Sequence, residues 1–216
     1  MNKTRIVCYG DSNTWGYDAS TGLRFPDDVR WTQLLAERLG LSYQICEEGL
    51  SGRTSVFEDP LFEGLNGLAS LTPILGSHNP IDLLVVMLGT NDCKQRFAAT
   101  AQNIADGVRR LVQKAQILPV WRNQPQVLIV APILIGEAIS TVPRISEGMG
   151  AVCAEKSWQL PRLLEATAAE CSCHYLDANA VVTANTVDYM HFDLASNQRF
   201  CDLLADWIAQ SGNDWT

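Results

Sequence analysis

The sequence predicts an α/β fold in which helices cover both faces of a parallel sheet, and three observations lead to this prediction. Short apolar runs alternate with helical patterns along the whole chain. Each apolar run is closed by a turn former, as is typical of strands buried on both faces of a parallel sheet. The length of 216 residues, with 47% hydrophobic and 19% charged residues, suits a single domain, 1–216, with a large core.

Five short apolar runs are the candidate strands. They are Ile6–Tyr9, Tyr43–Cys46, Leu83–Leu88, Val127–Val130 and the weaker His174–Leu176. Apolar residues recur at helical spacing between them, in Trp31–Leu39, Ile104–Ile117, Met149–Glu170 and Gln198–Ile208. Because alternating strands and helices imply right-handed crossovers, we predict a three-layer α/β/α sandwich around a flavodoxin-like parallel sheet of about five strands.

The charge balance argues against two classes of partner. Acidic residues outnumber basic ones by 24 to 16, for a formal net charge of −8. A surface of this sign repels phosphate backbones and anionic lipids, so we expect neither a nucleic acid nor a membrane as partner. No apolar run approaches the roughly 20 residues of a membrane-spanning helix, and the first residues lack a signal-peptide core and cleavage site. We therefore expect a cytoplasmic protein.

The seven cysteines are interpreted as reduced and mostly buried thiols, which is the usual state in the cytoplasm. Cys171, Cys173 and His174 form a short group of metal-binding residue types. The group lacks the second pair of ligands that a structural zinc site needs. We therefore expect no metal.

Polar residues gather directly after the first three predicted strands, where ligands of a parallel sheet bind. Ser12 lies in Gly10-Asp11-Ser12-Asn13-Thr14-Trp15-Gly16, Gly52 in Glu48-Gly49-Leu50-Ser51-Gly52-Arg53-Thr54, and Asn91 in Gly89-Thr90-Asn91-Asp92. A serine at a helix start lies near unpaired backbone N–H groups, and an Asn amide can donate to an anionic oxygen. The alternatives stay open at this point, with Ser12 as a helix N-cap and the other residues as ordinary turn formers.

His191 is the candidate general base. Of the three histidines it is the one with a carboxylate, Asp188, three residues earlier. This spacing lets the carboxylate reach the imidazole within one turn, where it can orient the ring and stabilise the imidazolium. Asp193 and Asp177 are rival partners for the ring, and a surface histidine with incidental acidic neighbours is the alternative interpretation.

Taken together, these segments resemble the four sequence blocks of the SGNH (GDSL-like) hydrolase family. The blocks are Gly10-Asp11-Ser12, Gly52, Gly89-Thr90-Asn91-Asp92 and Asp188-x-x-His191, and they span positions 10–193. The segments 10–16, 29–32 and 47–51 are similar to the bacterial arylesterase/acyltransferase branch. The chain departs from the family at Asn13, where the family name implies leucine. That position is not catalytic in the family, so we expect only the packing of the first helix to differ.

The resemblance implies a serine esterase with a Ser12–His191–Asp188 triad. It also implies an oxyanion hole made by the backbone N–H groups of Ser12 and Gly52 and the side-chain amide of Asn91. The expected substrates are short-chain or aryl carboxylic esters, and the acyl group on Ser12 passes to water or to an alcohol. This chemistry needs no metal or organic cofactor. Asp11 is interpreted as a structural cap, and a homo-oligomer is expected because relatives in the acyltransferase branch form oligomers.

The substrate-binding residues are harder to assign. Trp15, Tyr17 and Phe25 fall in a predicted loop after the nucleophile and are candidates for an acyl or aryl pocket. Positions in the core or at a subunit contact suit them equally well. The segments 54–66 and 133–142 are candidate walls of the site, and contact with a partner subunit is the alternative for 133–142.

Three other functions remain open. A carbohydrate O-deacetylase, or a lysophospholipase or thioesterase, would use the same triad. A flavodoxin-like binding module without catalysis would hold a phosphate or flavin at a helix N-terminus. That third function leaves the Asp188/His191 pair without a role.

Overall fold

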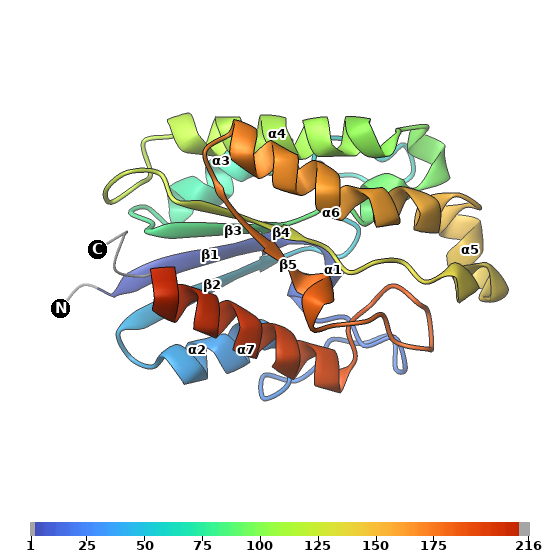
Figure 1. Ribbon diagram of the computed structural model, residues 1–216, viewed down its shortest axis with the longest axis horizontal. Helices are drawn as coiled ribbons and strands as arrows, with labels where there is room; N and C mark the ends of the chain where they lie inside the picture. Colours follow the sequence, from blue (N-terminus) through green and yellow to red (C-terminus); the bar gives the residue numbers. More distant parts are fainter. Residues whose placement is uncertain (1–2, 212–216) are drawn as a thin grey trace.

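A five-stranded parallel sheet lies at the centre of the computed structural model, which describes residues 3–211 (Figure 1). The strand order is β2-β1-β3-β4-β5, and each neighbouring pair is parallel. The strands are β1 (Thr4–Gly10), β2 (Tyr43–Gly49), β3 (Leu83–Met87), β4 (Val127–Ala131) and β5 (His174–Asp177). The predicted α/β fold class is confirmed, and each strand lies within a few residues of its predicted position.

Helices cover both faces of the sheet and bury two separate apolar clusters (Figure 1). One face carries α3 (Gly67–Ser77), α4 (Ala101–Ile117) and α6 (Cys153–Glu170), and the other carries α2 (Trp31–Leu39) and α7 (Leu194–Ser211). Successive residues of a strand point to opposite faces, so Val7 and Tyr9 of β1 enter the first cluster while Ile6 and Cys8 enter the second. Burial on both faces explains why the strands read as continuous apolar runs.

Two helical regions differ from the sequence-based prediction. Helix α3 was not predicted, and Pro73 lies inside it; a proline in a helix interior is normally a stop signal. The predicted helix Met149–Glu170 is two helices, α5 (Pro143–Met149) and α6. They are separated at Gly150, whose φ of 86° is a left-handed conformation that a helix cannot continue through.

The carboxyl ends of β1, β2 and β3 lie side by side. Gly10, the last residue of β1, is in register with Gly49 of β2 and with Met87 of β3. Arg53, in the loop after β2, donates from Nη1 to the carbonyl oxygen of Gly10 at 2.8 Å and to that of Glu48. The register and this buried guanidinium together bring the loops after these strands to one edge of the sheet.

At this edge Gly49 allows β2 to approach the chain that follows β1. A Cβ atom at Gly49 would lie 2.1 Å from the backbone nitrogen of Trp15. Backbone atoms cannot move away as a flexible side chain can, so only glycine fits here. The helix α1 (Ser12–Trp15) therefore packs directly against the end of β2.

Asp92 joins the loop after β3 to the loop after β2. Its buried carboxylate accepts hydrogen bonds from the backbone N–H of Ser55, at 2.9 Å from Oδ1, and from the Ser55 hydroxyl. Burial raises the pKa of the Asp92 carboxyl to about 6, although the hydrogen bonds from Ser55 oppose the increase.

None of the helices within residues 3–211 combines the length and the apolar character needed to cross a membrane.

The variant Gly49→Ala is expected to lower the free energy of unfolding by about 1–3 kcal/mol or more, because the added methyl group meets the backbone at Trp15. Urea unfolding followed by circular dichroism measures the change. Gly76→Ala is the matched control, since a Cβ atom at Gly76 has no atom within 4 Å and alanine favours a helix. Equal stability of the two variants would contradict the close approach at Gly49.

The variant Asp92→Asn is expected to remove part of the pH dependence of stability. The folded chain holds the Asp92 proton more tightly than the unfolded chain, because the pKa is about 6 instead of 3.8. The free energy of unfolding of the wild type should therefore fall by about 3 kcal/mol from this group alone as the pH rises from about 3 to about 7. Urea unfolding at a series of pH values compares the two proteins, and the same pH dependence in both would refute the assignment.

Candidate active site

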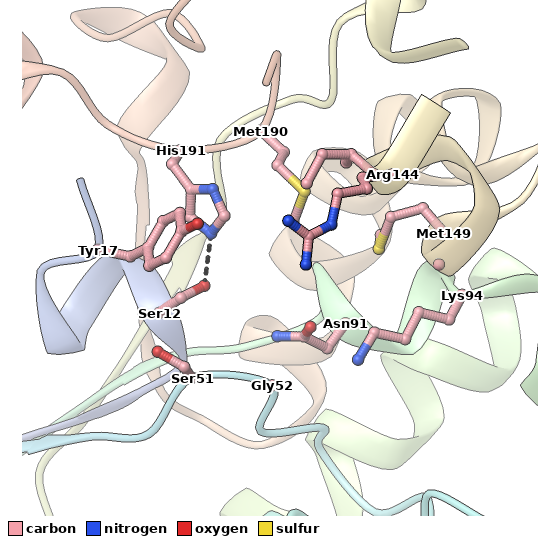
Figure 2. Close-up of a pocket in the computed structure, with 12 residues that line it drawn as sticks. Ser12, Tyr17, Ser51, Gly52, Asn91, Lys94, Arg144, Met149, Met190 and His191 are labelled. Carbon is pink, nitrogen blue, oxygen red and sulfur yellow. Dashed lines mark hydrogen bonds between the residues drawn. The ribbon is translucent and has the colours of Figure 1, made fainter. Parts of the chain in front are cut away.

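Three side chains that are far apart in the sequence form one hydrogen-bonded chain. The Oγ atom of Ser12 lies 2.8 Å from Nε2 of His191 (Figure 2). The other ring nitrogen of His191, Nδ1, lies 2.6 Å from Oδ2 of Asp188. All three residues are buried. The arrangement has the order of groups that a nucleophile, a general base and an orienting carboxylate require.

Ser12 is presented by a very short helix. It is the first residue of α1, and Asp11 is the N-cap, with Oδ1 accepting a hydrogen bond from the N–H of Asn13 at 3.0 Å. The helix ends after one turn because Gly16 adopts a left-handed conformation. The capping role that was open for Ser12 therefore belongs to Asp11. The pKa of the Asp11 carboxyl is raised, since burial outweighs the hydrogen bond from Asn13.

Asn13 connects this turn to the segment that carries the histidine. Its Oδ1 accepts a hydrogen bond from the N–H of Phe192 at 2.9 Å, and its Nδ2 donates to the carbonyl oxygen of Met190 at 3.3 Å. Met190 and Phe192 flank His191, so one side chain holds the backbone on both sides of the base. Position 13 was expected to affect only the packing of the first helix, but Asn13 also forms hydrogen bonds within the site.

Asp188 is held as an ionised carboxylate. Oδ1 accepts hydrogen bonds from the N–H groups of Met190 and His191 and from Nδ2 of Asn185, at 3.0–3.2 Å. Burial alone would raise the pKa of Asp188. The hydrogen bond from His191, the charge of that ring and the other donors outweigh burial and lower the pKa.

The rival acids make other contacts. Oδ1 of Asp177 accepts a hydrogen bond from the N–H of Asn179 at 3.0 Å, and Oδ1 of Asp193 accepts one from the N–H of Ser196 at 2.7 Å. Both carboxylates therefore hold local turns at their own positions. The ring of His191 faces Asp188.

Three N–H donors lie near the Ser12 hydroxyl. Within residues 3–211, no hydrogen-bond acceptor is found for the backbone N–H of Ser12 or of Gly52. Gly52 has a φ of 89°, which favours glycine at this position. The amide Nδ2 of Asn91 lies 3.2 Å from the carbonyl oxygen of Arg53 and 3.5 Å from Oδ2 of Asp11. These contacts orient the Asn91 amide beside Ser12 (Figure 2).

A cleft of about 220 Å³ opens above these groups. Ser12, Gly52, Asn91 and His191 line it (Figure 2). Tyr17 also lines it, with its ring centroid 4.6 Å from that of His191. The cleft is smaller than the roughly 300–1,000 Å³ of a typical drug-binding pocket, so it suits a small ester group.

Tyr17 is the one of the three suggested substrate-binding aromatic residues that lines this cleft. Trp15 lies beneath the guanidinium of Arg24, with Cζ 5.5 Å from the ring centroid. Phe25 is buried and lines a neighbouring cavity of about 540 Å³ together with Phe192.

The segments 54–66 and 133–142, which were the candidate walls of the site, also contribute no residue to the lining of the cleft. Phe57 stacks on Phe97 with ring centroids 5.6 Å apart, and Phe62 is exposed. Ile135 and Ile139 are buried in the core.

The cleft contains residues that the sequence did not identify. Lys94, Arg144, Met149 and Met190 contribute side chains to its lining. Lys94 is three residues from Asn91, and Met190 directly precedes His191. Their proximity in sequence to these two candidate site residues could have identified both as residues of the cleft. Arg144 and Met149 belong to α5, and nothing in their local sequence pointed to the site.

The cysteine and histidine group after α6 forms no metal cluster. Within residues 3–211, no three His, Cys, Asp or Glu side chains are arranged to hold an ion. Gln116 donates to the Sγ atom of Cys173, and Nε2 of His174 lies 3.1 Å from Oε1 of Gln126.

Comparisons with known proteins identify the family to which the chain belongs. The model of the GDSL-like lipase/acylhydrolase family matches residues 8–213. The M. smegmatis aryl esterase structure is 36% identical, with a TM-score of 0.85 over 96% of this chain and 99% of that one. A carbohydrate acetylesterase family member from Sinorhizobium meliloti is 31% identical, with a TM-score of 0.89 over 96% and 98%. Est24, a carbohydrate acetylesterase from the same organism, is 35% identical, with a TM-score of 0.85 over 96% and 99%.

No curated protein sequence matches the chain significantly. The family match extends over nearly the whole chain, and these structures exceed 30% identity over almost their full lengths. The chain therefore belongs to the GDSL-like lipase/acylhydrolase (SGNH hydrolase) family.

Proposed function

We propose that the protein is a serine esterase that hydrolyses short-chain or aryl carboxylic esters through an acyl-enzyme on Ser12. The observation that carries the proposal is the continuous hydrogen-bonded chain from Ser12 through His191 to Asp188, at the base of an open cleft. The small volume of the cleft favours a short acyl group over a long lipid chain.

The reaction has two halves. In the first, Nε2 of His191 takes the hydroxyl proton of Ser12 while Oγ attacks the ester carbonyl carbon. The tetrahedral oxyanion receives hydrogen bonds from the N–H groups of Ser12 and Gly52 and from the Asn91 amide. His191 then gives its proton to the leaving alcohol as the bond from the carbonyl carbon to the alcohol oxygen breaks.

In the second half, His191 removes a proton from water, and the resulting attack releases the acid and restores Ser12. An alcohol in the place of water gives a new ester, which is acyl transfer. Asp188 stays ionised throughout and stabilises the imidazolium that forms in each half. The Asn13 contacts keep the ring at the distance that proton transfer needs.

A carbohydrate acetylesterase is the second candidate function. Two structures that resemble this chain carry that description, at 31% and 35% identity. The same triad and donors would cleave an acetyl ester of a sugar, so the two functions differ only in the alcohol that leaves.

The variant Ser12→Ala is expected to lower kcat/KM for 4-nitrophenyl acetate by about four orders of magnitude or more, because the acyl-enzyme cannot form. Nitrophenolate release measures the rate. Ser77→Ala, at the exposed end of α3, is the matched control and should retain wild-type turnover. Retained turnover in Ser12→Ala would show that another residue is the nucleophile.

The same assay extends to the substrate class. A series of nitrophenyl esters of increasing chain length, run beside acetylated sugars, distinguishes the aryl esterase from the carbohydrate acetylesterase. A competing alcohol in the reaction measures acyl transfer as the ratio of new ester to free acid.

The variant Asn91→Ala is expected to lower kcat by about 10²–10³-fold with little change in KM. Its amide donates to the oxyanion, which exists only after the attack on the carbonyl carbon. Steady-state kinetics with 4-nitrophenyl acetate separates the two parameters. A raised KM with an unchanged kcat would mean that Asn91 binds the substrate in its ground state instead.

A further inference from the structure

The cleft above Ser12 has a charge opposite to that of the whole chain. The formal net charge is −8, yet the described residues that line the cleft include Lys94 and Arg144 and no aspartate or glutamate. The carboxylates of Asp11 and Asp188 are buried behind the lining. An ester without charge, such as an acetate, makes no use of two cations.

Arg144 is not neutralised by the protein. It lies at the start of α5, is exposed, and within residues 3–211 it forms no ion pair. Figure 2 shows its guanidinium turned into the cleft, facing Asn91 and Lys94. A guanidinium in this position presents a planar set of N–H donors that matches a carboxylate.

Lys94 is only partly neutralised. Its Nζ atom lies 3.7 Å from Oδ2 of Asp59, and Nη2 of Arg96 lies 3.2 Å from the same oxygen. Two cations therefore share one carboxylate, which leaves positive charge in excess. The side chain of Lys94 is 10% exposed. Burial, followed by the charge of Arg96, lowers the pKa of the Lys94 ammonium, so a bound anion would relieve an existing cost.

The two cations lie on one side of the nucleophile. In Figure 2, Tyr17 lies beside Ser12 and His191, whereas the Arg144 guanidinium lies above Asn91, and Lys94 and Met149 lie on the far side of Asn91. The leaving alcohol must stay within reach of His191, because that ring protonates it. The acyl part of the ester therefore extends toward Lys94 and Arg144.

We propose that the cleft selects esters whose acyl part carries a carboxylate, namely monoesters of short dicarboxylic acids. Arg144 and Lys94 bind the free carboxylate while Ser12 attacks the ester carbonyl. The products are the dicarboxylate and the alcohol. The proposal rests on the proposed esterase function and specifies its substrate class.

The test compares two pairs of alkyl esters by titration of the released acid. Monoethyl glutarate and ethyl pentanoate differ by a carboxylate on the acyl part. 4-Acetoxybutanoate and butyl acetate differ by a carboxylate on the alcohol. For each pair the measured quantity is the ratio of kcat/KM for the charged ester to kcat/KM for the neutral ester.

Arg144→Gln is expected to lower the ratio of the acyl pair by about tenfold, the usual effect of losing one charge-assisted hydrogen bond. Lys94→Gln should lower it in the same direction. Arg199→Gln removes the same charge from an exposed position on α7, and this control should keep the wild-type ratio. High salt should lower the wild-type ratio, because it screens charges at an open cleft.

The proposal would be overturned if the ratio for monoethyl glutarate and ethyl pentanoate were the same in Arg144→Gln as in the control. It would also be overturned if Arg144→Gln lowered only the ratio for 4-acetoxybutanoate and butyl acetate. Cleavage of ethyl pentanoate that depends on Ser12 tests the esterase function separately from the substrate class. If the protein cleaves ethyl pentanoate but does not prefer monoethyl glutarate, only the proposed substrate class is wrong. If the wild type cleaves none of the four esters, the proposed esterase function fails as well.

Discussion

The contact between residues 12 and 191 is the constraint on which the rest of the site depends. Ser12 follows the internal strand β1, and His191 lies in the segment before α7. Their 2.8 Å hydrogen bond is supported by the backbone contacts of Asn13 on both sides of the histidine. The indole of Trp31 in turn donates to the carbonyl oxygen of Asn13 at 2.9 Å. The proposed nucleophile and base are thus held by contacts to the main chain that do not depend on a bound substrate.

Buried polar groups beneath the cleft give it a fixed shape. The guanidinium of Arg53 donates to the carbonyl oxygens of Gly10, the last residue of β1, and of Glu48 in β2. Its Cζ atom lies 4.2 Å from the ring centroid of Tyr9. Asp92 holds Ser55 in the next loop. Charged groups in such surroundings are costly to bury and need several partners. The hydrogen bonds that these groups form offset the cost of burying them. The same hydrogen bonds hold the loops in place, so that the proposed oxyanion donors are oriented before any substrate arrives.

Much of the fold was predictable from sequence, whereas the shape of the cleft was not. Strands buried on both faces leave a strong local pattern, and glycines such as Gly49 mark their ends. Helix α3 was missed because Pro73 interrupts its local signal, although tertiary packing of Leu71 and Leu75 stabilises the helix. Lys94 and Arg144 line the same cleft only because the loop after β3 and the helix α5 meet above the sheet. Local sequence patterns do not indicate which distant segments come together. For the same reason the sequence could not separate Tyr17, which lines the cleft, from Trp15 and Phe25, which do not.

The distribution of the triad along the chain has a consequence for synthesis of the protein. The proposed nucleophile is translated early, at residue 12, and the proposed base only at residue 191. A nascent chain on the ribosome therefore exposes a serine hydroxyl without an imidazole to accept its proton, however much of the sheet has already formed. Any polypeptide released before codon 191 lacks the imidazole of the proposed triad, so premature termination is expected to yield fragments with greatly reduced activity toward esters.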